Sequence, residues 1–252
     1  DEAVAQHERV LARQRDLLGD LHPSTLGTKN NLAMALLACR SYEPAEALLR
    51  ELLDELSRVA APPQRVLAVR NNLASVHRAR GQWPAAAEQL ERVVAGFEEL
   101  GMGAHPNADT SRASLALALE RLDRLDEAAE YLEAAAIGRR ETLGPGDERV
   151  ARTLLRLGRL HARRDDLPAA VRWYRDAHEA AVTACAPEAS LRDVVQVDLA
   201  LALAAVGEAD EARSLLRERL DALRRLDVDP ERVERVPPAL RGIERGARTS
   251  RR

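Results

Sequence analysis

Four arginines of one predicted helix give the clearest chemical signal in the sequence. Steps of 4, 3 and 4 residues place them on one helix face: Arg152, Arg156, Arg159 and Arg163. Like charges at this spacing repel one another, so the row costs helix stability unless something offsets it. The arginine fork can bind a carboxylate bidentately. The row is therefore either a surface for an anionic ligand or a solvated arginine-rich face.

Two asparagine pairs form a second group of polar candidates. Asn30-Asn31 and Asn71-Asn72 each stand directly before a Leu-Ala pair. A primary amide offers donors and an acceptor at once, which suits it to hold a peptide backbone. The alternative is that one asparagine of each pair satisfies polar groups between helices. Asn30 and Asn71 are the stronger candidates for ligand contact, and Asn31 and Asn72 are the weaker ones.

Patterns that would indicate catalysis or metal binding are absent from the sequence. It contains no phosphate-binding glycine loop, nucleophile elbow or metal-ligand cluster. His7 and His178 lack cysteine or carboxylate partners at ligand spacing. His22 and His105 each precede a proline and are interpreted as turn residues. We predict that the chain is not an enzyme and has no catalytic residue, cofactor site or metal site.

The composition favours helices. The 252 residues are rich in Ala, Leu, Glu and Arg, and only six side chains are aromatic. Such a chain is a good helix former and a poor sheet former, so we predict an all-α fold. Apolar residues make up 46% of the chain, which is enough to bury a core.

Charge and apolar patterning exclude several classes of partner. The 38 Lys and Arg residues nearly balance 41 Asp and Glu residues, and this argues against a nucleic-acid binder. No run approaches 18 consecutive apolar residues, so we expect no membrane span. Asp1-Glu2-Ala3 does not resemble the start of a signal peptide. Cys39 and Cys185 are too few for a disulfide scaffold, which predicts reduced thiols and a cytoplasmic location.

Internal repeats must position these candidates. A leucine followed by a small residue recurs at spacings of 41, 42, 42 and 42 residues, and an alanine column keeps the same register. Each period contains two stretches with helical apolar spacing, separated by a short turn. The leucines are Leu32, Leu73, Leu115, Leu157 and Leu199, and the alanines are Ala3, Ala45, Ala86, Ala128, Ala170 and Ala212.

The small columns have a mechanical reason. Two antiparallel helices joined by a tight turn approach closely only where their side chains are small. The leucine column then fills the seam to the next pair. Because one pair cannot bury its apolar face alone, neighbouring pairs are expected to stack into a solenoid.

The order Leu-Ala, turn, aromatic or apolar residue and then Ala resembles the tetratricopeptide repeat. The period of 42 residues exceeds the usual ~34. The segment from His22-Pro23 to Leu32-Ala33 resembles the long repeat of kinesin light chains. The arginine-rich version is similar to those of high-GC bacterial signalling proteins, where arrays often follow an ATPase or a protein kinase. The resemblance implies a right-handed superhelical solenoid of antiparallel helix pairs that binds proteins or peptides.

The resemblance also implies that the first helix of each pair lines a concave face. The facing positions include both asparagine pairs, the arginine row and Glu120, which we expect to offset part of the row's charge. Arg152 and Arg156 match cations of a two-carboxylate clamp found in chaperone-binding members of the family. Ser75 and Ser114 stand where that clamp has asparagines, so the clamp is only half matched.

We predict a repeat array over residues 1–226 and a Pro- and Arg-rich tail over 227–252. Residues 1–18 match second helices and form a half repeat, which predicts a fragment of a longer protein. Residues 239–247 are a candidate capping helix. Five full pairs follow the half repeat, at about 22–60, 64–100, 106–142, 147–183 and 188–226.

The expected function is a scaffold module that binds an acidic protein or peptide segment on the concave face. One alternative is a regulatory or sensing arm of a larger signalling ATPase or protein kinase, with an upstream domain in the same chain. Another alternative is a self-association module. Neither nucleic acid nor a membrane is an expected partner.

Overall fold

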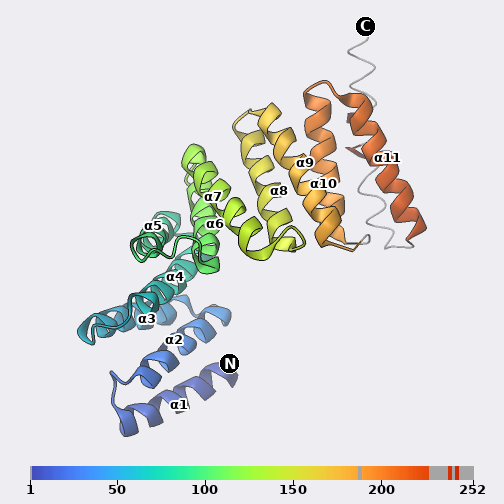
Figure 1. Ribbon diagram of the computed structural model, residues 1–252. Coiled ribbons are helices and arrows are strands. Elements are labelled where there is room, and N and C mark those ends of the chain that lie inside the picture. The colour runs from blue at the N-terminus through green and yellow to red at the C-terminus, as the bar shows by residue number, and fades with distance from the viewer. Residues whose placement is uncertain (1, 187–188, 227–237, 240–241, 244–252) are drawn as a thin grey trace. The chain divides into compact units, whose positions relative to one another are not determined.

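Eleven helices make up most of the residues that the computed structural model describes, which are 2–186, 189–226, 238–239 and 242–243 (Figure 1). No strand occurs among these residues, which confirms the predicted all-α fold. Most of the predicted capping helix and most of the predicted tail lie outside the described residues. The helices are α1 (Glu2–Leu18), α2 (Pro23–Ala38), α3 (Tyr42–Arg58), α4 (Pro63–Ala79), α5 (Trp83–Glu99), α6 (Pro106–Arg121), α7 (Leu125–Leu143), α8 (Glu148–Arg163), α9 (Leu167–Ala184), α10 (Ser190–Ala205) and α11 (Ala209–Arg225).

Side-chain caps fix where several first helices begin. His22 Nδ1 accepts a hydrogen bond from the Ser24 backbone N–H at 3.2 Å, and His105 Nδ1 accepts one from Asn107 N–H at 3.1 Å. Proline follows each histidine at the first helical position, where a missing N–H costs nothing. The interpretation of both histidines as turn residues is therefore confirmed.

Tight turns end the first helices through one residue in the left-handed conformation. Gly81 and Gly207 have φ of 72° and 93°, values that glycine adopts without strain. Arg40, Asp123 and Asp165 take the same conformation at φ of 60°, 60° and 61°. The short turn expected between the two helical stretches of a repeat is therefore the C-terminus of the first helix.

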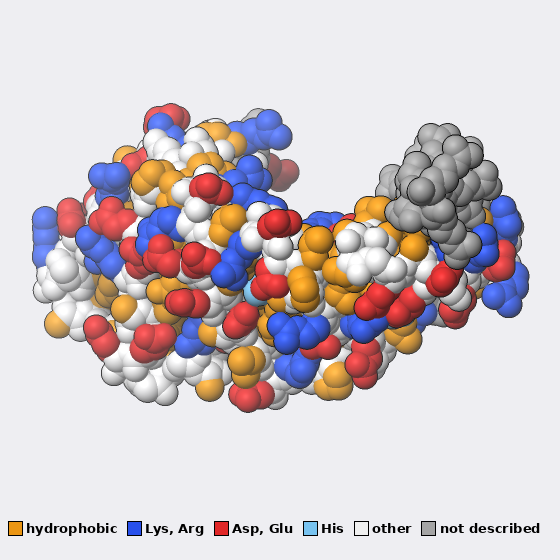
Figure 2. Space-filling model, turned by 90° about the horizontal axis from the view of Figure 1, so that it is seen from above, with side chains coloured by type: hydrophobic (Ala, Val, Ile, Leu, Met, Phe, Trp, Pro, Cys, Tyr) orange, Lys and Arg blue, Asp and Glu red, His pale blue; other side chains and the backbone are white. Residues whose placement is uncertain are grey.

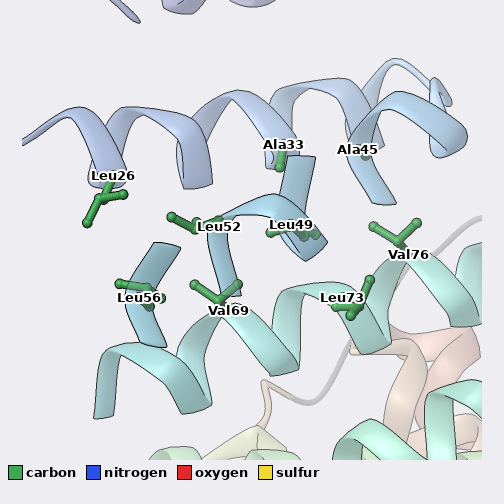
Figure 3. Packing of buried hydrophobic residues seen from close by; sticks show 9 residues of the cluster. All are labelled: Leu26, Ala33, Ala45, Leu49, Leu52, Leu56, Val69, Leu73 and Val76. Atoms are coloured by element: carbon green, nitrogen blue, oxygen red, sulfur yellow. The ribbon is translucent and has the colours of Figure 1, made fainter. Parts of the chain in front are cut away.

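The chain divides into two compact units, Asp1–Ala128 and Ala129–Arg252. Unit 1 holds α1 to α6 and the first residues of α7. In its larger core, three leucines of α3 lie between side chains of α2 and α4 (Figure 3). A smaller core joins α4, α5 and α6 through Leu67, Val93, Phe97 and Ala108.

Both small columns are buried as the packing argument requires. Ala33 and Ala45 have no exposed surface. In Figure 3, Ala33 lies beside the N-terminal part of α3. Ala86, Ala128, Ala170 and Ala212 are equally inaccessible. Ala3 in α1 is the exposed member of the alanine column, and α1 packs mainly on α2.

Unit 2 holds the remainder of α7 with α8 to α11. In it α8 and α9 pack against each other, and Leu154, Leu157, Leu160, Ala170 and Tyr174 are all buried. The leucine column continues in α10 with Leu199, which is also buried. None of the described helices is both long and apolar enough to cross a bilayer.

Two ion pairs lie inside the helix pairs. Lys29 of α2 has no exposed surface and binds Glu55 and Glu51 of α3, with Nζ 2.9 Å from Glu51 Oε1. Arg219 of α11 donates from Nε to Asp193 Oδ1 of α10 at 2.7 Å, and both side chains are buried. Each pair satisfies charges that the apolar surroundings would otherwise penalise.

Candidate functional site

A pocket lies between α4 and α6 in unit 1. Its volume is about 300 Å³. Its buried apolar side chains, Leu67 and Phe97, are called the floor, and its amides, hydroxyls and one imidazole are called the rim. We call it the polar pocket, and it is lined by Gln64, Leu67, Ala68, Asn71, Asn72, Phe97, Met102, His105, Asn107, Thr110 and Ser111.

The connection between α5 and α6 makes one wall of the polar pocket. It spans residues 100–105, whereas α3 and α4 are joined by 59–62 only. The Phe97 and His105 rings stack with centroids 5.9 Å apart and planes 10° from parallel. Met102 packs on the same small core. The longer connection therefore places its side chains over α4 instead of turning directly into α6.

Arg112 stabilises the connection between α5 and α6 through its hydrogen bonds. Its Nη1 donates to the Gly103 carbonyl at 2.7 Å and to Asp109 Oδ1 at 3.0 Å. Its Nη2 lies 3.6 Å from Glu98 Oε1 at the end of α5. Asp109 is fully buried, and neither Asp109 nor Arg112 lines the pocket. The two opposite charges therefore pair with each other outside the pocket lining.

The rim of the polar pocket retains unused hydrogen-bonding capacity. Within the described part of the chain, the side-chain amides of Asn71 and Asn107 make no hydrogen bond. The Thr110 and Ser111 hydroxyls donate to the carbonyls of Pro106 and Asn107 at 3.0 and 2.8 Å. Their oxygens therefore remain available as acceptors.

The four asparagines of the two pairs differ in their hydrogen bonds and in whether they line the polar pocket. Asn72 Nδ2 donates to Asn30 Oδ1 at 2.7 Å, so these side chains satisfy each other between α4 and α2. Asn71 and Asn72 line the polar pocket, whereas Asn30 and Asn31 do not. The alternative reading, in which one asparagine of each pair bridges helices, thus describes Asn30 and Asn72. Ligand contact by any of the four remains a prediction.

The arginine row lies on α8 as its spacing predicted, but ion pairs offset part of its charge. Arg152 Nε is 2.8 Å from Glu148 Oε1, one turn earlier on the same helix. Arg159 Nε is 2.6 Å from Asp198 Oδ2 on α10. Arg156 is half-buried and Arg163 is exposed. Glu120, the partner expected from the sequence, lies in the other unit.

Helix α10, the first helix of the next pair, has Val194 and Leu201 at the positions equivalent to Arg152 and Arg159. Val194 and Val197 on α10 are half-buried, and Leu201 is 48% exposed. The Arg159–Asp198 pair joins the two helices. Elsewhere, acidic and basic side chains are interspersed on the visible face in Figure 2. Helices α8 and α10 therefore place arginines near the apolar side chains of Val194 and Leu201, with Asp198 binding Arg159.

The buried histidines have structural partners. His77 Nδ1 lies 2.8 Å from Gln82 Oε1, and His161 Nδ1 lies 3.2 Å from Asp166 Oδ2. A backbone hydrogen bond from Ala169, with smaller help from His161, lowers the pKa of Asp166. Among the described residues, no group of three potential ligands is placed to hold a metal ion.

Sequence signals could have found part of this site. Glu148 stands four residues before Arg152, which is the spacing of a helical ion pair. Asp198 occupies the position of Arg156 one repeat later, so aligning the repeats points to it. The pocket residues Phe97, Met102 and Asn107 were missed, because they come together only through the path of residues 100–105.

Comparison with protein families gives a match to the description "Tetratricopeptide repeat" over residues 25–59, 65–136 and 108–181. No curated protein sequence matches the chain significantly.

Solved structures share the fold. BtubC (BKLC) from P. vanneervenii superposes with a TM-score of 0.73 at 20% identity, over 96% of this chain and 92% of that one. A putative kinesin light chain of Podosopora anserina with nearly identical TPR-like repeats gives a TM-score of 0.71 at 25% identity, over 82% and 99%. The Rap conjugation gene regulator of plasmid pLS20, in complex with the Phr* peptide, gives 0.52 at 15% identity, over 89% and 58%.

Proposed function

The chain belongs to the tetratricopeptide repeat family, of the kinesin-light-chain-like type, and we propose that it is a scaffold that binds a segment of another protein. The polar pocket carries this proposal. It combines an apolar floor with the amides of Asn71 and Asn107, which have no partner among the described residues. Such convergence of a few polar groups over an apolar surface is typical of binding sites.

A peptide chain suits this pocket chemically. Amide side chains can donate to a backbone carbonyl and accept from a backbone N–H. The Rap regulator of plasmid pLS20, which shares the fold, was solved in complex with the Phr* peptide. The proposal includes no catalytic role, and a cytoplasmic location is part of it.

The test is selection of a displayed random-peptide library on the purified chain. Selected peptides should bind less tightly when Asn71 and Asn107 are both changed to Ala. Gln6→Ala is the matched control, because Gln6 also carries an amide, is exposed on α1 and lies outside the polar pocket. Equal binding by the double variant and the control would exclude the pocket as the site.

An acidic segment on the arginine row of α8 is a second candidate ligand. Arg152 and Arg159 are 62% and 53% exposed, and their present partners are the exposed Glu148 and the half-buried Asp198. Exposed ion pairs are individually worth about 0–1 kcal/mol, so an acidic ligand can replace them at little cost. Several arginines together would set the sign of the ligand and speed its arrival.

Changing Arg152 and Arg159 to Gln tests this candidate. Binding of acidic peptides should weaken and lose its salt dependence, while basic peptides should be unaffected. Arg92→Gln on α5 removes an exposed arginine of another helix and is the control. An unchanged preference for acidic peptides in the double variant would show that the row is only a solvated face.

Two further roles remain proposals of a different kind. A regulatory arm of a signalling ATPase or kinase requires an upstream domain, which the complete reading frame would contain. A self-association module requires the mass in solution to rise with protein concentration. Sedimentation of the purified chain over a wide concentration range distinguishes the second role from a monomeric binder.

A further inference from the structure

The side chain that fits the polar pocket can be specified further, given that the proposed function is correct. The pocket's described lining contains no Asp, Glu, Lys or Arg, although these residues make up 31% of the chain. The nearby charges of Arg112 and Asp109 are engaged with each other and with the Gly103 carbonyl. A charged side chain entering the pocket would find no counter-ion there.

The size of the pocket suits one side chain. About 300 Å³ is at the lower end of the range for ligand pockets, where whole drug-sized molecules occupy more. Buried Leu67 and Phe97 and half-buried Met102 give the pocket an apolar surface for a short aliphatic stem. The ligand group should therefore be an apolar stem with a polar tip.

The hydrogen-bonding pattern of the rim defines the tip. Because His105 Nδ1 accepts from Asn107 N–H, a neutral imidazole carries its proton on Nε2 and can donate. Asn71 supplies a further donor, while the oxygens of Thr110 and Ser111 are acceptors. A tip that both accepts and donates satisfies both sets, and a carboxamide does so with one oxygen and one NH₂ group.

We infer that the polar pocket binds a glutamine side chain of the partner segment and discriminates against glutamate. Glutamate has the same shape but lacks the donor and adds a charge that the pocket cannot neutralise. Methionine has a similar stem but lacks both hydrogen-bonding groups. The three residues therefore separate shape, charge and hydrogen bonding from one another.

The experiment uses three fluorescent peptide pools whose central residue is Gln, Glu or Met and whose other positions are randomised. Anisotropy titration with the full chain should show the Gln pool binding roughly tenfold more tightly than either other pool, the effect expected for one lost hydrogen bond. The preference should vanish in the Asn71→Ala, Asn107→Ala double variant and persist in Gln6→Ala, which changes an exposed amide on α1. Thr110→Arg, at an exposed rim position, should raise binding of the Glu pool by supplying a cation.

The outcomes separate this inference from the proposed function. Equal binding of the three pools, still weakened by the double asparagine variant, would overturn the glutamine assignment and leave the peptide site in place. Tightest binding by the Glu pool or the Met pool would also overturn the glutamine assignment and leave the peptide site in place. Binding by no pool would overturn both.

Discussion

The ring of Tyr174 on α9 occupies the space that a Cβ atom on Gly158 of α8 would need. A Cβ built on Gly158 would lie 2.4 Å from Tyr174 Cδ1 and 2.5 Å from Cε1, far inside van der Waals contact. Repeats one, two, three and five have Ala at the glycine position and Leu at the tyrosine position. Repeat four therefore has Gly and Tyr at a helix contact where the other full repeats have Ala and Leu.

Gly158→Ala should destabilise unit 2 even though alanine is the better helix former. In an open helix position the change would stabilise by about 0.5–1 kcal/mol, so the sign of the effect is diagnostic. Overpacking against Tyr174 should instead cost about 1–3 kcal/mol, measured by urea unfolding. Adding Tyr174→Leu restores the pair of the other repeats and should recover most of the loss. A single variant as stable as the parent would show that the seam relaxes freely.

The burial of Tyr174 should also make unfolding depend on alkaline pH. Burial, helped by the charge of Asp198, raises the pKa of Tyr174 to about 12. In the unfolded chain a tyrosine ionises near pH 10, so the folded state binds the proton more tightly. The stabilising contribution is complete below about pH 10 and is lost as the pH rises toward 12.

Comparison with Tyr174→Phe isolates this effect. The free energy of unfolding of the parent should fall more steeply than that of the variant over this range, and the absorbance of one tyrosinate should appear late only in the parent. Parallel curves for the two proteins would mean that Tyr174 is accessible to hydroxide.

Removing Lys29 is expected to lower the free energy of unfolding mainly because it leaves the buried Glu55 carboxylate without a cation. Lys29 has no exposed surface and Glu55 is buried beside it. Lys29→Met should cost about 3–5 kcal/mol, since a buried carboxylate remains without its cation. The double change Lys29→Met, Glu55→Leu should recover much of that loss.

A surface pair provides the control for this prediction. Arg92 and Glu88 lie one turn apart on α5, and both are exposed. Arg92→Met should change the unfolding free energy by about 0–1 kcal/mol. If Lys29→Met were equally mild, Glu55 would be reaching solvent and the pair would not be a buried one.

The repeat pattern allowed the helices and their seams to be predicted, because small and apolar residues recur at fixed spacing for a packing reason. Ala33 and Ala45 lie fully buried where the two columns predicted contact. The His22 and His105 caps followed from a local motif. Each of these depends on residues close in sequence or on one repeated register.

The polar pocket could not be predicted in the same way. Its wall depends on how residues 100–105 fold over α4, and that path is set by the Phe97–His105 stack and by Arg112. The Asn30–Asn72 bond joins two different positions of the repeat, so comparing equivalent positions does not suggest it. These are tertiary relationships between repeats, which periodicity does not encode.

The cap of α8 should be sensitive to acid. Asp147 Oδ1 accepts from the Arg149 backbone N–H and from Arg149 Nε, both at 2.9 Å. The Arg149 side chain first, and its backbone N–H second, lower the pKa of Asp147 to about 2. Because the folded state holds the proton less tightly than the unfolded chain, the stabilising contribution is present above about pH 4 and is lost as the pH falls toward 2.

Asp147→Asn separates the charge from the cap. Asparagine keeps an oxygen that can accept from Arg149 N–H but does not titrate, whereas Asp147→Ala loses both. Urea unfolding should show the parent more stable than the Asn variant at pH 5, with the difference shrinking steadily toward pH 2. The Ala variant should be the least stable at pH 5, because α8 then begins without a side-chain acceptor. A gap between the parent and the Asn variant that stays constant with pH would mean that the Asp147 carboxylate makes no charge-dependent contribution to folding.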